Sequence, residues 1–542
     1  MTGARSAAAR RRPVVLPPAG SVRPVSRQWW RDAVVYEVYL RSFADSDGDG
    51  VGDLEGIRSR LSHLVELGVD AVWLTPFYPS PMADHGYDVA DYCDVEPSFG
   101  DLAGFDRLLA EAHDVGLRVI VDLVPNHTSS AHAWFVEALA DPTSPMRERY
   151  VFRVGKGVDG AQPPNNWQSM FGGPAWTRIP DGQWYLHLFD TGQPDLDWDC
   201  PAVHEEMLRV LRFWLDRGVD GFRIDVAHAL YKHPELADSP EVPSFDGIEA
   251  MASTHVWDRE EVLAVYERWR ELTDSYAGDR MLVGEVFLYD VPRIARYVSD
   301  SRLHQAFNFT VMQTPWGAGP LRETVETALQ HFHPGTWVLS NHDLVRHPTR
   351  FGGGPLGVRR GLAVSALLYA LPGSPYLYQG EELGLEESVV PEHLRQDPLF
   401  LRTGGQQAGR DGCRTPLPWE AHAPGLGFTT GTPWLPFGDG AAELAVDRQR
   451  ADPTSTLSTY ARLLRRRRAL LPELPQEVEI TSPTAELMVV RRGPLTAVLN
   501  TSVESVQLSV DGLTEVLEST AGGADLTDGI VTVPAAATVW LR

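Results

Sequence analysis

The sequence predicts an α/β fold, a (β/α)8 TIM barrel with an inserted subdomain after strand 3 and a C-terminal antiparallel β-sandwich domain. Three observations predict it. From residue 33, eight short apolar runs alternate with amphipathic helical stretches, which indicates buried parallel strands in a closed barrel. The interval at 128–198 is too long for a single helix. Alternating segments with glycine-containing turns follow the last helical stretch at 459–471 and indicate antiparallel strands.

The elements follow in a regular order. The eight expected strands are AVVYEVYL (33–40), DAVWLTPF (70–77), LRVIVDLVP (117–125), GFRIDVA (221–227), MLVGEVF (281–287), AFNFTV (306–311), TWVLSNHD (336–343) and PYLYQGEE (375–382). Helical patterns between them include IRSRLSHLVELG, FDRLLAEAHDVG, EEMLRVLRFWLDRG and VLAVYERWRELT, and three of these four end in a glycine suited to a helix C-cap. The C-terminal strands are expected in EVEITS, ELMVVRR, LTAVLNTS, VQLSV and ATVWLR.

These patterns divide the chain into five segments. We expect a disordered basic tail at 1–28, the first part of the barrel (domain A) at 29–127, the inserted domain B at 128–198, the second part of the barrel at 199–468 and the C-terminal β domain at 469–542. The tail is basic because residues 1–31 hold seven arginines and no acidic residue.

Composition excludes several classes of function. The 542 residues carry a formal net charge of −25, which argues against a nucleic-acid partner because phosphates require a basic surface. The three cysteines are too few for a disulfide framework, which is typical of a reducing compartment. No apolar run approaches the ~20 residues of a membrane span. We therefore expect a cytoplasmic protein without a membrane partner, either a monomer or a homodimer.

Polar residues stand where the expected strands end, and active sites of this fold lie at those ends. They are Asp122, Asn126, His127, Arg223, Asp225, Glu285, Asn341, His342 and Asp343. A single pair such as Arg223 and Asp225 could be a buried ion pair alone. Three acids at neighbouring strand ends instead favour cleavage of a glycosidic bond, in which one carboxylate attacks and a protonated carboxyl donates to the leaving oxygen. Arg223 favours ionisation of Asp225.

Four of these segments resemble the signature regions of the α-amylase superfamily, glycoside hydrolase family 13. They are DLVPNH (122–127), GFRIDVAH (221–228), GEVF (284–287) and SNHD (340–343). The resemblance implies a retaining mechanism with Asp225 as nucleophile, Glu285 as general acid/base and Asp343 as a stabiliser of the bound sugar. It also implies that Arg223, His127 and His342 contact the glucosyl unit.

Two further segments resemble the α-glucosidase and oligo-1,6-glucosidase branch of that family. In GYDVADY (86–92), preceded by Asp84, the resemblance implies that Asp84 binds the distal hydroxyls of the terminal glucose and that Tyr87 stacks on its ring. In RDGCRTPLPW (410–419) it implies that Arg414 pairs with Asp84. Such a pair would close the pocket floor and restrict the enzyme to the non-reducing end.

The resemblance implies a small α-glucoside as substrate and leaves the linkage open. Val226, directly after the expected nucleophile, resembles enzymes that cleave α-1,6 bonds. GFRIDVAH and LHQAFNF (303–309) together resemble α-glucosidases that act on α-1,4 bonds, and we favour an exo-acting α-glucosidase on maltose and short malto-oligosaccharides. The alternatives are an oligo-1,6-glucosidase, a trehalose synthase or glucosyltransferase, and a sucrose-splitting relative. A non-catalytic sugar-binding barrel would be expected to lack one of the three acids.

The stretch DSDGDGVGD (45–53) places acids at alternate positions between glycines, as a loop around one cation does. A solvated loop with Asp-Gly turns is the alternative. The stretch also resembles the loop of this branch that holds one Ca²⁺. That resemblance implies a single structural Ca²⁺, with Asp45, Asp47, Asp49, Asp53 and the Val51 carbonyl as ligands. No organic cofactor is expected.

Overall fold

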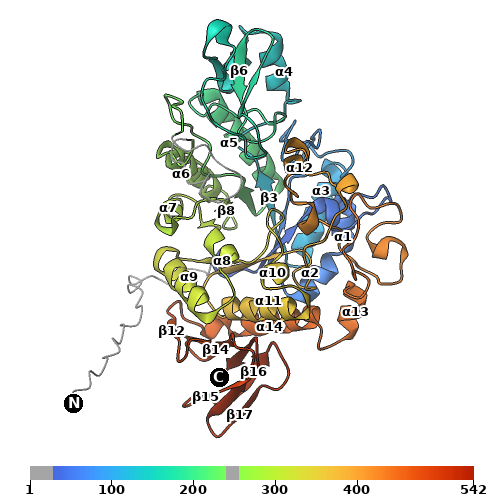
Figure 1. Ribbon diagram of the computed structural model, residues 1–542, viewed down its shortest axis with the longest axis vertical. Coiled ribbons are helices and arrows are strands. Elements are labelled where there is room, and N and C mark those ends of the chain that lie inside the picture. Colours follow the sequence, from blue (N-terminus) through green and yellow to red (C-terminus); the bar gives the residue numbers. More distant parts are fainter. Residues whose placement is uncertain (1–27, 240–255) are drawn as a thin grey trace, which may run out of the picture.

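A barrel of parallel strands forms the centre of the molecule in the computed structural model, which describes residues 28–239 and 256–542 (Figure 1). Its strands are β1 (Val35–Val38), β2 (Ala71–Leu74), β3 (Arg118–Leu123), β7 (Gly221–Ile224), β8 (Met281–Gly284), β9 (Gln305–Ala306), β10 (Thr336–Val338) and β11 (Ser374–Tyr378). They are hydrogen-bonded in the order β10-β11-β1-β2-β3-β7-β8-β9, and every pair is parallel. The barrel predicted from the sequence is confirmed. The basic tail lies outside the described residues, apart from Gln28.

Helices surround the strands. They are α1 (Leu54–Ser59), α2 (Leu61–Leu67), α3 (Leu102–Asp114), α5 (Pro201–Arg217), α6 (Glu261–Asp274), α7 (Val291–Ala295), α8 (Phe309–Gln313), α9 (Ala318–His331), α10 (His347–Arg350) and α11 (Gly354–Tyr369). Gly68 and Gly218 end α2 and α5 in the left-handed conformation that favours glycine, as expected. The helix expected at 57–68 is interrupted at Arg60, which separates α1 from α2.

The strand expected at 306–311 is wrong for most of its length. Only Gln305 and Ala306 pair with β8, and α8 begins at Phe309. The reason is local, because the side chain of Asn308 accepts a hydrogen bond from the Thr310 amide and so caps the helix at its N-terminus. An apolar run of this length does not by itself distinguish a buried strand from a short buried helix.

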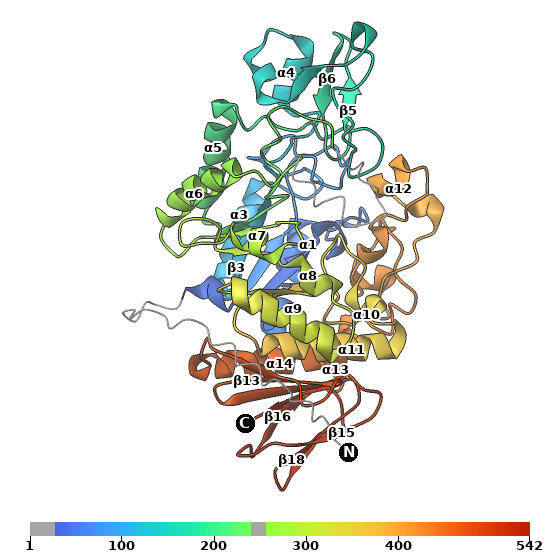
Figure 2. The ribbon, with the colours of Figure 1, turned by 60° about the vertical axis from the view of Figure 1, so that its left-hand side comes forward.

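Two smaller units lie at opposite ends of the barrel (Figures 1 and 2). Between β3 and α5 the chain forms α4 (Ala133–Ala140) and the antiparallel strands β4 (Phe152–Val154), β5 (Trp176–Arg178) and β6 (Gln183–Leu186). These belong to domain B. After α12 (Pro398–Arg402), α13 (Val446–Ala451) and α14 (Thr456–Leu470), the chain enters the C-terminal β domain.

The C-terminal domain contains one five-stranded and one three-stranded antiparallel sheet. Its strands are β12 (Glu479–Thr481), β13 (Leu487–Arg492), β14 (Leu495–Asn500), β15 (Val506–Ser509), β16 (Val516–Ser519), β17 (Asp525–Thr527), β18 (Ile530–Val533) and β19 (Ala537–Leu541). The sequence patterns missed β16, β17 and β18. The side chains of Thr538 and Trp540 donate to carbonyls of α11 at 2.7 and 2.9 Å, which ties this domain to the barrel.

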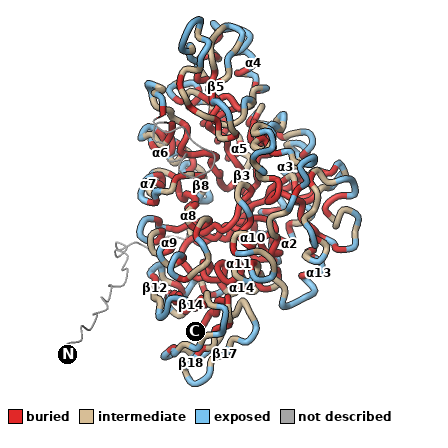
Figure 3. Tube along the Cα trace, viewed as in Figure 1, coloured by how far each residue is buried: buried red, intermediate tan, exposed pale blue. Residues whose placement is uncertain are grey.

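Burial is concentrated in the barrel strands and in the segments that follow them (Figure 3). Several charged side chains lie within this buried region, including Glu37 on β1, Asp122 on β3 and Arg223 on β7. Burying charge is costly unless the groups are paired, so these positions indicate an organised polar site. Among the described residues, no helix has both the length and the apolar character needed to span a membrane.

Candidate active site

Asp225 and Glu285 directly follow the neighbouring strands β7 and β8. The amide of Asp225 donates to the Leu123 carbonyl and that of Glu285 donates to the Ile224 carbonyl, both at 2.8 Å. These bonds continue the parallel ladders by one residue beyond the strands. Both carboxyl groups therefore begin at the same edge of the sheet, the edge at which barrel active sites lie.

Arg223 joins three carboxyl groups in what we call the acid/base cluster, which consists of Arg223, Asp122, Asp225 and Glu285. Its Nη1 lies 2.7 Å from Asp225 Oδ1 and 3.0 Å from Asp122 Oδ1, and its Nη2 lies 2.8 Å from Glu285 Oε2. The Asp225 and Glu285 side chains are 8% and 11% exposed, so both still reach solvent. One guanidinium thus holds the expected nucleophile and the expected acid side by side.

The acid/base cluster has more acids than its single cation can neutralise. Burial raises the pKa of Asp225 well above its usual value. The negative charges of Glu285 and Asp122 add to this, and Arg223 acts against it. Burial likewise raises the pKa of Asp122 to about 6. Arg223 does favour ionisation of Asp225, as expected, but burial outweighs it. The raised pKa values of Asp225 and Asp122 therefore favour retention of a proton within the cluster, and a general acid needs such a proton.

Val226, the residue after Asp225, has an unusual backbone conformation. Its φ of +43° lies in the left-handed region, which is strained for a β-branched residue. In this conformation its amide donates to Glu285 Oε2 at 3.0 Å. A backbone contact from the neighbour of the expected nucleophile therefore helps to orient the expected acid.

Arg410 and Arg414 organise a second group, which we call the floor cluster and which consists of Arg410, Arg414, Asp84, Asp343 and Asp397. Arg410 contacts Asp84 at 2.6 Å, Asp343 at 3.1 Å and Asp397 at 2.6 Å. Arg414 contacts Asp343 at 2.9 Å. The expected pairing of Asp84 with Arg414 is therefore wrong, because Arg410, four residues earlier in the same motif, takes that place. Arg414 instead holds Asp343.

The other expected contacts to the sugar lie beside these clusters. The Tyr87 ring stacks on His342 with centroids 5.3 Å apart, and its hydroxyl donates to Asp122 Oδ2 at 3.1 Å. His127 Nε2 lies 3.1 Å from Gln193 Nε2, and Gln193 also donates to Asp84 at 3.1 Å. Burial lowers the pKa of His127 to about 4, so this imidazole is neutral at pH 7. The structure thus brings all nine expected catalytic and sugar-binding residues into one region.

The sequence patterns did not predict several further residues of this site. Glu37 on β1 contacts His342. Lys232 Nζ lies 2.8 Å from Asp195 and 2.6 Å from Asn126, and so connects domain B with the end of β3. Arg410 was visible in the RDGCRTPLPW motif, whereas Glu37 and Lys232 carried no signal except that charge within or beside a buried segment needs a partner.

The acidic loop at 45–53 forms a compact turn, and none of its carboxyl groups belongs to either cluster. Carboxyl oxygens of Asp45, Asp47 and Asp49 lie within 4.8 Å of one another. Asp53 lies outside that group. Its side chain accepts from the amide and hydroxyl of Ser46 and caps the first turn of α1. The donor set of three carboxylates fits a hard cation such as Ca²⁺.

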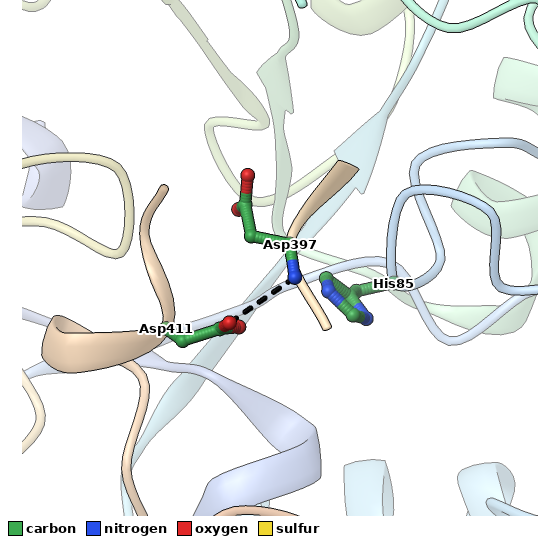
Figure 4. Close-up of side chains that lie close together, drawn as sticks. All are labelled: His85, Asp397 and Asp411. Atoms are coloured by element: carbon green, nitrogen blue, oxygen red, sulfur yellow. Dashed lines mark hydrogen bonds between the residues drawn. The ribbon is translucent and has the colours of Figure 1, made fainter. Parts of the chain in front are cut away.

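A second group of possible ligands, His85, Asp397 and Asp411, shares Asp397 with the floor cluster (Figure 4). Asp411 accepts from the backbone amide of Asp397 at 3.1 Å, the bond drawn in Figure 4. His85 Nδ1 lies 3.2 Å from Nη1 of Arg41, which can only donate. Nδ1 is therefore the acceptor and the proton of this neutral ring lies on Nε2. Arg41, Arg410 and the Asp397 amide already pair with His85, Asp397 and Asp411 respectively, so we assign no metal to this group.

The barrel, the two adjacent carboxyl groups on Arg223 and the buried floor define a class of protein, a glycoside hydrolase with its site at the carboxyl ends of the strands. Comparison with known proteins agrees. The model of the α-amylase catalytic domain family matches residues 37–474. The chain therefore belongs to the α-amylase family.

Individual relatives place the chain within a branch of that family. A probable α-glucosidase of Rhizobium meliloti is 41% identical over 485 residues, which covers 85% of this chain and 86% of the relative. An oligo-1,6-glucosidase of Parageobacillus thermoglucosidasius is 37% identical over 481 residues, with coverage of 82% and 84%. The crystal structure of the α-glucosyl transfer enzyme XgtA is 40% identical, with a TM-score of 0.87 and coverage of 95% and 99%. The α-glucosidase and oligo-1,6-glucosidase branch expected from the sequence is thus confirmed.

Proposed function

We propose that the protein is a retaining, exo-acting α-glucosidase that releases glucose from the non-reducing end of maltose and short malto-oligosaccharides. The observation that carries the proposal is the contact of one guanidinium with both Asp225 and Glu285. A retaining mechanism requires the two carboxyl groups to lie only about 5–5.5 Å apart. Contacts of 2.7 and 2.8 Å from the two terminal nitrogens of Arg223 support such a separation.

In this mechanism Asp225 attacks the anomeric carbon while Glu285 protonates the leaving oxygen. Glu285 then removes a proton from the water that releases the glucosyl group from Asp225. Asp343 accepts hydrogen bonds from sugar hydroxyls, because Arg410 and Arg414 favour its ionised form. His127, His342 and Arg223 complete the contacts to the glucosyl unit.

The floor cluster supports exo action. Asp84 and Arg410 are in direct contact at 2.6 Å, and this pair would block the far end of the site against a longer glucan. Asp84 retains acceptor capacity for the distal hydroxyls of a terminal glucose. This proposal assigns the blocking pair to Asp84 and Arg410, with Arg414 as the support of Asp343.

Glucosyl transfer is the second candidate, because a transfer enzyme is 40% identical to this chain over nearly its whole length. Transfer and hydrolysis share the same acids and differ in the acceptor. NMR of turnover on maltose, isomaltose, trehalose and sucrose in parallel tests both. Release of α-glucose from maltose supports the proposal. Inverted product, or no product from any of the four sugars, contradicts it, and a new disaccharide in place of glucose establishes transfer.

We further propose one structural Ca²⁺ in the 45–53 loop, held by Asp45, Asp47, Asp49 and the Val51 carbonyl. Among the described residues, the structure gives these three carboxyl groups no lysine or arginine partner, so a cation would offset their mutual repulsion. Asp53 would act by holding the loop against α1, because it lies outside the group of carboxyl oxygens within 4.8 Å of one another and its side chain caps that helix.

We also propose a cytoplasmic protein that is a monomer or a homodimer. The three cysteines are all free in the structure, in keeping with a reducing compartment. Light scattering coupled to size-exclusion chromatography measures the assembly, and any mass above that of a dimer contradicts the proposal.

A further inference from the structure

Glu37 is a buried acid on β1 that neither proposed catalytic step uses. It is 2% exposed and lies in the centre of the barrel sheet, between β2 and β11. Its Oε1 lies 2.5 Å from Nδ1 of His342 and 3.3 Å from the His342 amide nitrogen. A carboxyl group this deep in a barrel must be paired, hydrogen-bonded or neutralised, because burial of the charged form is costly.

His342 is held on every side. Its ring stacks on Tyr39 at 5.6 Å and on Tyr87 at 5.3 Å, with interplanar angles of 24° and 15°. Its Nε2 lies 3.3 Å from Asp343 Oδ2. The ring therefore presents one nitrogen to Glu37 and the other to Asp343, and the stacked tyrosines oppose its rotation.

Counting protons at the two ring nitrogens limits the possible states. Arg410 and Arg414 lie 3.1 and 2.9 Å from Asp343, and their charges favour its ionised form against the opposing effect of burial. An ionised carboxylate only accepts, so the 3.3 Å contact of Asp343 with Nε2 favours a hydrogen on that nitrogen. The close contact between Nδ1 and Glu37 also requires a hydrogen between them. The pair therefore holds two protons and is neutral overall.

The surroundings decide on which partner the shared proton lies. Burial raises the pKa of Glu37 well above its usual value, and the charges of Asp343 and Asp122 add to this effect against that of Arg223. Burial lowers the pKa of His342, and Arg414, Arg223 and Arg410 lower it further against the effect of Asp343. Both influences favour a neutral imidazole and a neutral carboxyl group.

We propose that Glu37 is a positioning residue that works as a carboxylic acid. It donates its proton to Nδ1 of His342 and so fixes the neutral Nε2–H tautomer, which offers a hydrogen-bond donor to Asp343 and to the glucosyl unit. The inference rests on the proposed function for its catalytic consequence, but the protonation state of Glu37 can be observed without substrate.

Infrared difference spectroscopy at pH 7 between the wild type and Glu37→Gln tests the protonation directly. We expect a protonated-carboxyl C=O stretching band that is present in the wild type and absent from the variant. Because both proteins share every other carboxyl group, the difference isolates Glu37. A carboxylate band in its place, or no band, would overturn the proposal.

Activity of two variants tests the positioning role. Glu37→Leu leaves Nδ1 without a donor, and we expect kcat/KM on p-nitrophenyl α-glucoside to fall by about 10–100-fold, the loss typical of partners that orient metal-ligating histidines. Glu37→Gln can donate its amide hydrogen to Nδ1, so it should recover at least about tenfold of that loss. Equal losses in the two variants, or a fully active Glu37→Leu, would contradict the positioning role.

A third variant separates this inference from the proposed function. If Asp225→Asn remains active, the catalytic assignment fails. If Asp225→Asn is inactive while both Glu37 variants match the wild type, the catalytic assignment stands and the Glu37 inference fails. Where Glu37→Leu does not fold, the infrared spectrum of Glu37→Gln still decides the protonation state.

Discussion

Two clusters of buried arginines and carboxyl groups lie side by side in this site, and they differ in their balance of charge. The acid/base cluster has one arginine for three carboxyl groups. The floor cluster has two arginines for three carboxyl groups. The first is short of positive charge and the second is nearly balanced.

This difference in charge has opposite effects on proton affinity. In the acid/base cluster, burial raises the pKa of Asp225 well above its usual value and that of Asp122 to about 6. In the floor cluster, Arg410 and Arg414 outweigh burial and lower the pKa of Asp397 and Asp343. Asp84 is an exception, because burial still raises its pKa to about 6. Few arginines per carboxyl group favour protonated carboxyl groups, which proton transfer requires. More arginines per carboxyl group favour ionised carboxylates, which can accept hydrogen bonds from a sugar.

The largest expected effect is loss of the chemical step. Asp225→Asn and Glu285→Gln should each lower kcat on maltose by on the order of 10⁴–10⁶-fold, because each removes a group that acts on the reacting bond. The melting temperature (Tm) of Asp225→Asn should equal or exceed that of the wild type, since the substitution relieves repulsion between buried carboxyl groups.

A substrate whose leaving group needs little protonation distinguishes the role of Glu285 as acid from that of Asp225 as nucleophile. With α-glucosyl fluoride, Glu285→Gln should recover much of its loss while Asp225→Asn should not, because only the acid is dispensable for a good leaving group. Equal recovery in both variants would contradict the assignment.

A substitution in the floor cluster should weaken the binding of the substrate. Arg410→Leu leaves three buried carboxyl groups without one of their two cations, and we expect a loss of about 2–5 kcal/mol in transition-state binding. Most of it should appear as a raised KM for maltose. Arg58→Leu is the matched control, because Arg58 also bridges two carboxyl groups, Glu55 and Glu111, but at the surface. A change in Arg410→Leu no larger than in that control would mean that the floor does not bind the sugar.

The pH dependence of stability should carry opposite signs in the two clusters. Between about pH 4 and 6, folded Asp122 binds a proton that the unfolded chain has released, so stability falls as the pH rises. Asp122→Asn should remove up to about 1.4 kcal/mol per pH unit of that slope. Denaturant unfolding at several pH values measures it, and an unchanged slope would contradict the raised pKa.

Asp397 supplies the opposite case. Its pKa is lowered in the folded state, so its ionised form contributes stability above the pKa of the unfolded chain, and this is lost as the pH falls through the folded pKa. Asp397→Asn should therefore destabilise the protein most near neutral pH and least in acid. A penalty that stays constant from pH 3 to 7 would count against the lowered pKa.

The smallest effect concerns the carboxyl groups of the acidic loop, which have no arginine partner within residues 28–239 and 256–542. If a cation serves Asp45, Asp47 and Asp49, removal of Ca²⁺ with EDTA should lower Tm by a few degrees. Added Ca²⁺ should restore it in the wild type but not in Asp49→Asn. A Tm that is insensitive to EDTA would favour the solvated loop.

Much of the site could be predicted from the sequence because its residues lie in short motifs at strand ends. Asp225 and Glu285 each directly follow a strand, and strand order alone makes them neighbours. The pairing within the floor cluster could not be predicted, because Arg410 and Arg414 lie four residues apart in one motif and only the path of that segment decides which of them meets Asp84. Glu37 was missed because a single acid in an apolar strand gives no indication of which distant residue it contacts.

The sequence by itself determined the barrel, the family and the candidates for the catalytic acids, since periodicity and motif spacing are local properties of the chain. The tertiary structure decided how charge is shared: which arginine serves which carboxyl group, where protons are retained, and how Val226 and Glu37 orient their neighbours. The physical reason is that burial and charge–charge energies depend on distances between segments hundreds of residues apart, as between Glu37 and His342.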